Sequence, residues 1–242
     1  DHTGSRGLGD VYKSQEYLEK KYNSDGLEKL DHKVCSAICG SEKYKGGILD
    51  INAAHLHPLR FVFGLAKAAI QAGTDIFEKS EVTSLLPGKV NRTLTNSGEI
   101  QSEFVVLGCN GYLGNLEQKV AAKVMPINNF IVATEPLGDR AESVLAKDIA
   151  VADTKFVVNY FRLSDDKRLL FGGGENYSYK FPSNITSTVL KPMLEIFPQL
   201  SDVKIDYAWG GTLGITMNRM PYFCRVTDTI LSASGFSGPG IG

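Results

Sequence analysis

A glycine-rich stretch, residues 235–242, has the composition of a ligand-binding turn. It follows a short apolar run, residues 230–233, which predicts a buried strand. Glycines let backbone N–H groups approach a ligand closely, and a helix start carries partial positive charge. A strand, a glycine turn and a helix start can therefore cradle an anionic or electron-rich group. The same spacing also fits a tight structural turn before an ordinary helix.

A second turn follows another apolar run. Residues 104–108 are apolar without alternation, which predicts a strand buried on both faces. The run ends in Cys109, Asn110 and Gly111, a turn that exposes backbone amides. Because ligands of open α/β sheets bind at the carboxyl ends of strands, this turn is a second candidate for ligand contact.

The titratable residues give weaker signals. His55 and His57 could titrate near neutral pH and shuttle protons, although His57 precedes Pro58 and is expected to be structural at a helix start. The cysteines have neither metal-ligand spacing nor a disulfide framework, so we expect buried thiols in a reducing compartment and no metal site. The cysteines are Cys35, Cys39, Cys109 and Cys224.

Composition restricts the class of protein. The 242 residues are 43% hydrophobic and 22% charged, as in a soluble globular protein of one large or two modest domains. A net charge of -1 offers no basic surface for nucleic acid. We expect no membrane span and no signal peptide, and hence a cytoplasmic protein. The first residue is Asp1 rather than Met, which suggests a piece of a longer chain.

Periodicity predicts the elements that position these residues. A surface helix is expected within residues 11–32, and a clearer helix from Pro58 to Gly73 with an apolar stripe through Phe61 and Leu65. Three strands follow, in residues 75–86, 89–96 and 100–108. From Val124 the chain is mostly β, with one helix near Pro192. The expected fold class is α/β (α+β).

Seven segments in combination resemble a known family, the FAD-dependent amino-acid and amine oxidoreductases of the D-amino-acid oxidase, glycine oxidase and sarcosine oxidase group. The match is closest to the gamma-glutamylputrescine oxidoreductase-like branch. It covers roughly residues 44–242. The segments are HLHPLRFVFGLAKAA, VVLGCNGYLG, VMPINNFIVATEPLG, NYFRLSDDKRLLFGGGE, FPQLSDVKIDYAWGG, ITMNRMPYF and GFSGPGIG.

The resemblance implies a partial FAD-binding Rossmann-like domain, residues 1–123 and 226–242, and a mostly antiparallel substrate domain, residues 124–225. The family's initial strand, G-x-G-x-x-G turn and helix have no counterpart, because the glycines of residues 4–9 follow no strand. A helix after Gly242 is missing as well. No cysteine stands near Gly211, so FAD is expected to be non-covalent. We expect this chain by itself to be inactive and to bind FAD weakly.

The resemblance also implies which residues contact FAD. Val82 matches the adenine contact, and the turn at residues 109–111 matches the pyrophosphate and ribose contacts. The isoalloxazine ring is expected beside the turn that holds Thr216 and Pro221, and beside the final loop. Reduced flavin carries negative charge, which backbone amides stabilise, although Pro239 removes one such donor. The final-loop contacts are Gly235, Phe236, Ser237, Gly238, Gly240 and Ile241.

The implied activity is oxidation of a carbon–nitrogen bond in a small-molecule amine or amino-acid derivative, with hydride transfer to flavin and hydrolysis of the imine. Leu213 stands where some members place a carboxylate-binding arginine, which favours an amine or a gamma-glutamyl-capped amine. Leu170 and Phe171 replace an oxygen-activating lysine, so oxidase and dehydrogenase both remain open. A flavin-free binding or scaffold module is the alternative. No catalytic residue and no oligomeric state are assigned. The expected substrate contacts are Tyr160, Arg162, His55 and Trp209. Tyr160 fits a packing role equally well, and for Trp209 a packing role is favoured.

Overall fold

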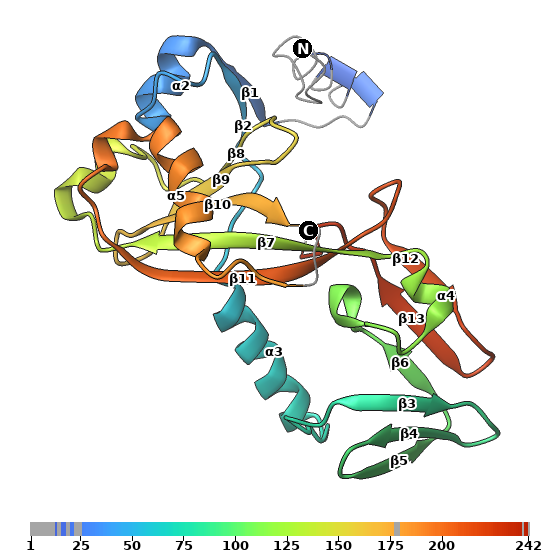
Figure 1. Cartoon of the computed structure of the whole chain (residues 1–242). Coiled ribbons are helices and arrows are strands. Elements are labelled where there is room, and N and C mark those ends of the chain that lie inside the picture. The colour runs from blue at the N-terminus through green and yellow to red at the C-terminus, as the bar shows by residue number, and fades with distance from the viewer. Residues whose placement is uncertain are drawn as a thin grey trace. The chain divides into compact units, whose positions relative to one another are not determined.

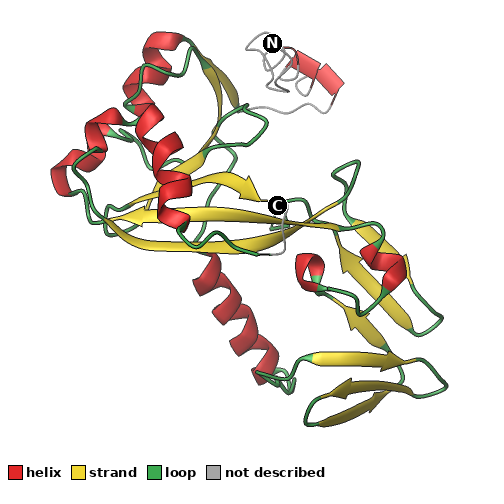
Figure 2. Cartoon of the chain, in the orientation of Figure 1, coloured by secondary structure: helices red, strands yellow, loops and turns green. Residues whose placement is uncertain are grey.

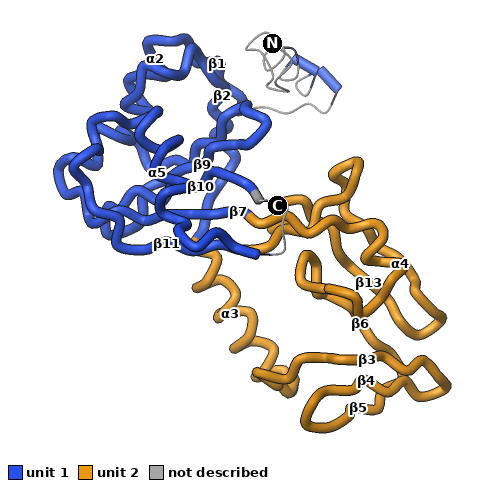
Figure 3. The backbone as a smooth tube through the Cα atoms, viewed as in Figure 1, with its two compact units in different colours: residues 1–56, 129–175, 180–210 blue, residues 57–128, 176–179, 211–242 orange. Residues whose placement is uncertain are grey.

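The computed structural model describes residues 13, 16–17, 20–21, 26–176, 180–238 and 240–241. Its chain divides into two compact units (Figure 3). Among the described residues, unit 1 holds those up to Leu56, Asn129–Glu175 and Lys180–Gly210. Unit 2 holds His57–Asn128, Asn176 and the residues from Gly211 onward.

Unit 1 is organised on a five-stranded sheet with the order β11-β7-β10-β9-β8. A separate two-stranded sheet, β1-β2, and the helices α2 and α5 complete the unit (Figures 1 and 2). The bounds are β1 Leu27–Leu30, α2 His32–Cys39, β2 Gly47–Asp50, β7 Met125–Thr134, η2 Gly138–Ser143, β8 Val151–Ala152, β9 Tyr160–Leu163, β10 Leu169–Asn176, α5 Ile185–Ile196, η3 Pro198–Leu200 and β11 Ile205–Ile215.

One face of the five-stranded sheet is the core of unit 1. Phe161 on β9 stacks on Phe171 of β10 with ring centroids 5.7 Å apart, and Phe197 meets Phe161 edge-on at 5.0 Å. Helices α2 and α5 contribute Cys35, Ile38, Cys39, Val189, Met193 and Ile196 to this core. Since strand residues alternate between faces, the neighbours of these phenylalanines lie on the opposite face of the sheet.

Unit 2 contains two three-stranded sheets, β12-β13-β6 and β3-β4-β5. Strand β13 pairs in parallel with β6, whereas the other pairs are antiparallel. A small core of Leu107, Leu113, Val120, Val124, Val226 and Ile230 lies beneath them. The bounds are α3 Pro58–Gln71, β3 Val82–Leu86, β4 Asn91–Thr95, β5 Gly98–Ser102, β6 Val105–Leu107, η1 Asn110–Tyr112, α4 Gln118–Ala121, β12 Tyr222–Arg225 and β13 Ile230–Ser234.

The mixed α and β class expected from the sequence is confirmed, and so is the helix at Pro58. His57 caps that helix, because its Nδ1 accepts a hydrogen bond of 3.3 Å from the Arg60 N–H. Pro192 lies inside α5, beyond its first turn. No helix among the described residues is long and apolar enough to cross a membrane.

Two expectations from periodicity are wrong, and the expectation of buried cysteines holds in part. Leu27–Leu30 is a strand, because pairing with β2 satisfies its backbone and overrides helical propensity; much of the expected helix lies outside the described residues. Residues 104–108 are not buried on both faces, since Phe104 is 61% and Val106 66% exposed. The expected burial of all cysteines holds for Cys35 and Cys39, whereas Cys109 and Cys224 are half-buried.

The compact units differ from the expected domains at four places. The described residues 26–56 cluster with the five-stranded sheet, and residues 124–128, 176 and 211–225 cluster with the parallel pair. The assignment of residues 1–123 with 226–242 to FAD binding and of 124–225 to substrate binding remains a prediction about function.

Helix α3 exposes its apolar side chains. None of its residues is buried, and Leu59, Phe63 and Leu65 are 57%, 64% and 55% exposed. The expected inward stripe through Phe61 is therefore uncovered, as Phe61 itself is 41% exposed. An apolar surface of this extent favours association with another apolar surface.

We predict that the chain self-associates through α3 and that Phe63→Lys reduces this association, because the change places a charge in the exposed apolar surface. Sedimentation velocity measures the effect. The unfolding free energy should change by less than about 0.5 kcal/mol, since Phe63 is exposed. Lys67→Gln on the same helix is the matched control and should associate as the wild type does. Equal association of Phe63→Lys and wild type would contradict the prediction.

Candidate functional site

The two glycine-containing turns lie at the same edge of a parallel strand pair. Ile230, Leu231 and Ser232 of β13 face Val105, Val106 and Leu107 of β6 in register. Both strands therefore run to the same edge, where residues 108–112 follow β6 and residues 235–238 follow β13 (Figure 1). The carboxyl edge of a parallel pair is where open α/β sheets bind ligands.

Asn110 joins three segments of this edge. Its backbone has a positive φ of 48°, and its Oδ1 accepts a hydrogen bond of 2.9 Å from the Gly235 N–H. The same carboxamide packs against Gly214, where an added Cβ would come within 2.3 Å of Oδ1. Gly111 packs as closely, because a Cβ there would lie 2.7 Å from the Leu213 carbonyl. We call Asn110, Gly111, Gly214 and Gly235 the Asn110 cluster.

The turn at Thr216 is tied to the same loop. The Thr216 hydroxyl donates to the Met220 carbonyl at 2.7 Å, and the Thr216 N–H donates to the Ser237 hydroxyl at 3.4 Å. The Ser237 N–H in turn donates to the Gly214 carbonyl at 2.9 Å. A Cβ on Gly235, whose φ is 72°, would come within 2.4 Å of Thr216 Cγ2. The structure thus brings together the two predicted turns and the final loop.

The other predicted cofactor residues lie outside the Asn110 cluster. Cys109 is half-buried, and burial raises the pKa of its thiol. Val82 lies on β3 and pairs with Thr95 of β4. Phe236 meets Phe223 edge-on with centroids 6.1 Å apart. Pro221, Gly238, Gly240 and Ile241 are exposed, whereas Pro239 and Gly242 lie outside the described residues.

The loop after β13 retains backbone donors for a ligand. The N–H groups of Gly235 and Ser237 are used inside the loop, whereas those of Phe236 and Gly238 have no acceptor among the described residues. Gly238 has a φ of 105° and no heavy atom within 4 Å of the Cβ position. Free amides beside an open glycine fit the electron-rich edge of a flavin ring. The described residues contain no G-x-G-x-x-G turn for a pyrophosphate, so the fit covers one part of FAD.

The face of the five-stranded sheet opposite the phenylalanine core carries the predicted substrate residues. Tyr160 and Arg162 flank the buried Phe161 on β9. Trp209 and Asn129 share their face, because Gly210 and Phe130 next to them meet on the core side. Trp209 is 43% exposed. Alternation therefore places three of the four predicted substrate residues on one face.

Tyr160 is held in place by two neighbours that sequence reasoning missed. Its ring lies over Gly172, where an added Cβ would come within 2.0 Å of Cζ. Its hydroxyl donates to Asn129 Oδ1. Burial, and then the charge of Glu175, raise the pKa of Tyr160 to about 12. The phenol is therefore neutral at physiological pH and acts as a hydrogen-bond donor. The run of residues 172–174, all glycine, is the sequence signal for this close approach.

Arg162 and His55 are in contact. Arg162 Nη1 lies 3.1 Å from His55 Nδ1, and His55 Nε2 lies 3.2 Å from Asp148 Oδ1. Asp148 precedes β8, which pairs with the strand that carries Arg162. Nothing in the sequence pattern marked Asp148.

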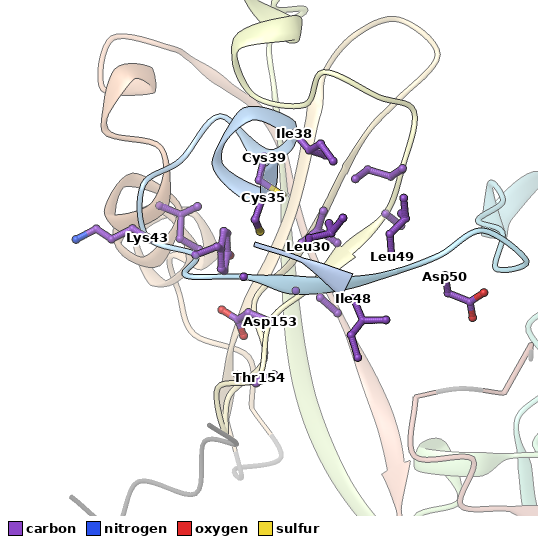
Figure 4. Close-up of a pocket in the computed structure, with 18 of the residues that line it drawn as sticks. Leu30, Cys35, Ile38, Cys39, Lys43, Ile48, Leu49, Asp50, Asp153 and Thr154 are labelled. Carbon is purple, nitrogen blue, oxygen red and sulfur yellow. The ribbon is translucent and has the colours of Figure 1, made fainter. Parts of the chain in front are cut away.

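A cavity of about 770 Å³ in unit 1 lies beside this contact and is lined by both His55 and Asp148. Figure 4 shows Cys35 and Cys39 of α2 at its wall, with Lys43, Asp50 and Asp153 around it. Burial raises the pKa of both thiols, that of Cys39 to about 12, so both are neutral and weakly nucleophilic at neutral pH. Among the described residues no three His, Cys, Asp or Glu side chains form a group that could hold a metal ion.

We predict that Asn110→Ala destabilises unit 2 by about 1–3 kcal/mol, because it leaves the buried Gly235 N–H without an acceptor and places alanine at positive φ. Asn110→Asp keeps an acceptor at the same position and should stay close to wild type. Hydrogen exchange at the Gly235 amide measures the difference, faster in Asn110→Ala and protected in Asn110→Asp. Equal exchange rates of the Gly235 amide in the two variants would contradict this role of the Asn110 side chain.

A second prediction concerns alkaline pH. The raised pKa of Tyr160 stabilises the folded state below pH 10, the ordinary tyrosine value, and this stabilisation is lost as pH rises to about 12. Between these values the wild-type chain should lose about 2–3 kcal/mol more unfolding free energy than Tyr160→Phe. Urea unfolding at successive pH values measures the loss. The unfolding free energies of the two chains should change equally between pH 7 and 9. Equal losses of unfolding free energy above pH 10 would contradict the raised pKa of Tyr160.

The sequence and structure were compared with those of known proteins. The family model described as "FAD dependent oxidoreductase" (DAO) matches residues 3–242. A "Probable oxidoreductase OrdL" of Rhizobium meliloti is 39% identical over 227 residues, 93% of this chain and 53% of that protein. "Gamma-glutamylputrescine oxidoreductase" of Escherichia coli is 35% identical over 224 residues, 92% of this chain and 53% of that protein. The chain thus spans about half the length of the curated relatives it matches.

Solved structures show the same fold. Glycine oxidase from Geobacillus kaustophilus superposes with a TM-score of 0.78 at 17% identity, over 96% of this chain and 63% of that chain. L-proline dehydrogenase from P. horikoshii gives a TM-score of 0.73 at 19% identity, over 97% of this chain and 66% of that chain. The expected FAD-oxidoreductase fold and FAD as the family's cofactor are confirmed. The chain belongs to the DAO family of FAD-dependent oxidoreductases.

Proposed function

We propose that the whole protein oxidises the carbon–nitrogen bond of an amine or amino-acid derivative similar to gamma-glutamylputrescine, with FAD held non-covalently. The observation that carries the proposal is the Asn110 cluster, which fixes two backbone loops at the carboxyl edge of the β6–β13 pair in a chain of the FAD-dependent family. The Escherichia coli relative, named for gamma-glutamylputrescine, supports the substrate class.

Bound FAD would supply the hydride acceptor for oxidation of the carbon–nitrogen bond, and hydrolysis of the resulting imine would follow. The residues of this chain bind and orient the reactants. The N–H groups of Phe236 and Gly238, which have no acceptor among the described residues, would stabilise negative charge on the flavin ring. Cys109, Asn110 and Gly111 would hold the ribose and pyrophosphate. Val82, Thr216, Pro221, Gly235, Ser237, Gly240 and Ile241 are proposed as further cofactor contacts.

The substrate lies against the sheet face of Tyr160, Arg162, Trp209 and the nearby His55. Tyr160 offers a neutral phenol, since its pKa of about 12 keeps the proton on the hydroxyl. Gly211 leaves the β11 backbone without a cysteine for a covalent flavin bond, which supports non-covalent FAD. The four free cysteines fit a reducing compartment, so a cytoplasmic location is part of the proposal.

The chain itself is expected to bind FAD weakly, with Kd above about 10 µM, because the described residues supply loop amides for the ring and no pyrophosphate turn. Quenching of flavin fluorescence on titration of the chain measures this. Asn110→Ala should weaken any binding further, whereas Asn110→Asp should preserve it. Tight binding to the wild-type chain would show that the pyrophosphate turn is dispensable.

The whole protein should be yellow when purified, and its flavin spectrum should bleach when gamma-glutamylputrescine is added without oxygen. Tyr160→Phe should retain the flavin and raise KM by about tenfold, the cost of one lost hydrogen bond. A folded but colourless whole protein would reject the oxidoreductase proposal in favour of a flavin-free binding module.

A further inference from the structure

The cavity of unit 1 reaches the core side of the five-stranded sheet. Its volume of about 770 Å³ lies within the range of about 300–1,000 Å³ that is usual for small-molecule sites. Figure 4 shows Cys35, Ile38 and Cys39 of α2 at its wall, and these side chains belong to the hydrophobic core of unit 1. Of the four expected substrate contacts, only His55 lines it. The cavity is therefore a candidate for a second binding site, apart from the sheet face proposed for the substrate.

The lining of the cavity favours an uncharged and mainly apolar occupant. Aliphatic side chains of β1, β2 and β8 add to the wall, namely Leu30, Ile48, Leu49 and Val151. The charged lining residues have both signs: Lys43, Lys45 and Lys155 on one side of the balance, and Asp50, Asp148, Asp153 and Glu195 on the other. Since three cationic and four anionic groups nearly cancel, the cavity does not select an ion of either sign.

Tyr44 brings an unpaired hydroxyl to this cavity. Tyr44 lines the cavity, and its Oη is buried without a hydrogen-bond partner among the described residues. Folded proteins pair the great majority of their buried polar groups, with other protein groups, with water or with a ligand. Burial, and then the charge of Asp153, raise the pKa of Tyr44, so its hydroxyl keeps the proton at neutral pH. Tyr44 is therefore a hydrogen-bond donor that lacks an acceptor.

The neighbours of Tyr44 hold its ring and leave its hydroxyl unpaired. The ring stacks on Phe161 with centroids 6.2 Å apart, and His32 Nδ1 lies 2.8 Å from the Tyr44 carbonyl oxygen. The carboxylate of Asp153 accepts from the backbone N–H and the carboxamide of Asn159 at 3.0 and 2.8 Å. Because the Tyr44 hydroxyl is closed to solvent, a ligand that binds it must displace the atoms that cover it.

We propose that this cavity binds a neutral, mainly apolar small molecule with an oxygen acceptor such as a carbonyl, and that Tyr44 donates a hydrogen bond to that oxygen. The apolar wall supplies affinity by removing ligand surface from water, and the hydroxyl fixes the orientation of the ligand. This division between an apolar wall and a few polar groups is usual in small-molecule sites. The site uses no flavin and does not rest on the proposed function.

The test uses NMR of the 242-residue chain labelled at isoleucine methyl groups, because Ile38, Ile48, Ile149 and Ile196 line the cavity. The probe is acetophenone. The control is α-methylstyrene, which has nearly the same shape and carries a methylene group in place of the carbonyl oxygen. We expect acetophenone to shift the four methyl resonances with a Kd of about 1 mM and to leave Ile230 of unit 2 unshifted. No shift of these four resonances at about tenfold that concentration overturns the site.

Tyr44→Phe keeps the ring and removes the donor. It should lower the affinity for acetophenone by about threefold to tenfold and leave that for α-methylstyrene unchanged. The variant should be as stable as the wild type, since the hydroxyl has no partner to lose. Tyr207→Phe, at an exposed tyrosine of the same unit, is the matched control and should bind both probes as the wild type does. An unchanged affinity for acetophenone in Tyr44→Phe, or an equal loss for both probes, overturns the hydrogen bond.

A second pair of variants tests the apolar wall. Ile48→Asn places a polar group in the lining and should weaken binding of both probes by about threefold to tenfold. Ile51→Asn is the matched control, because Ile51 is 61% exposed and does not line the cavity. It should leave both affinities unchanged. Equal affinities of Ile48→Asn and Ile51→Asn for the two probes overturn the role of the wall.

Discussion

The hydrogen bond from the Gly235 N–H to the Asn110 carboxamide is the interaction on which the candidate cofactor edge depends. Parallel pairing of β6 and β13 brings two strand ends to one edge, but pairing alone does not set the loops that follow. Asn110 tolerates positive φ because its short polar side chain bonds locally, and this conformation directs the carboxamide to Gly235 and Gly214. Any side chain at Gly214 or Gly235 would separate the segments, so the glycines here are a packing requirement.

The five-stranded sheet applies a different constraint, the alternation of its two faces. Phe161 and Phe171 are buried on the core face of the sheet. Because strand residues alternate between faces, Tyr160 and Arg162 must lie on the opposite face. Gly172 then lets the Tyr160 ring lie flat on the sheet, where its hydroxyl reaches Asn129. The burial of the two phenylalanines thus determines on which face of the sheet Tyr160 and Arg162 lie.

Local pattern and tertiary contact explain which features the sequence could predict. The helix at Pro58 and the turns at Asn110 and Gly235 follow from short-range signals, namely a proline start and glycines after apolar runs. Leu27–Leu30 was mistaken for helix because its pairing with β2 is formed by residues about twenty positions away. The exposure of Val106 could not be predicted either, since an apolar run shows that a face suits burial and not what covers it. Asn129 and Asp148 were missed because their partners, Tyr160 and His55, are distant in sequence.

Arg162 and Arg168, two arginines of this sheet, differ in their partners. Arg168 is saturated by Asp166, Asp206 and the Thr134 carbonyl and lies over the Tyr207 ring, so its charge is neutralised where it stands. Arg162 lies on the neighbouring strand β9, and its Nη1 is 3.1 Å from His55 Nδ1. No carboxylate contacts Arg162 among the described residues, so the ion pairs that hold Arg168 have no counterpart at Arg162.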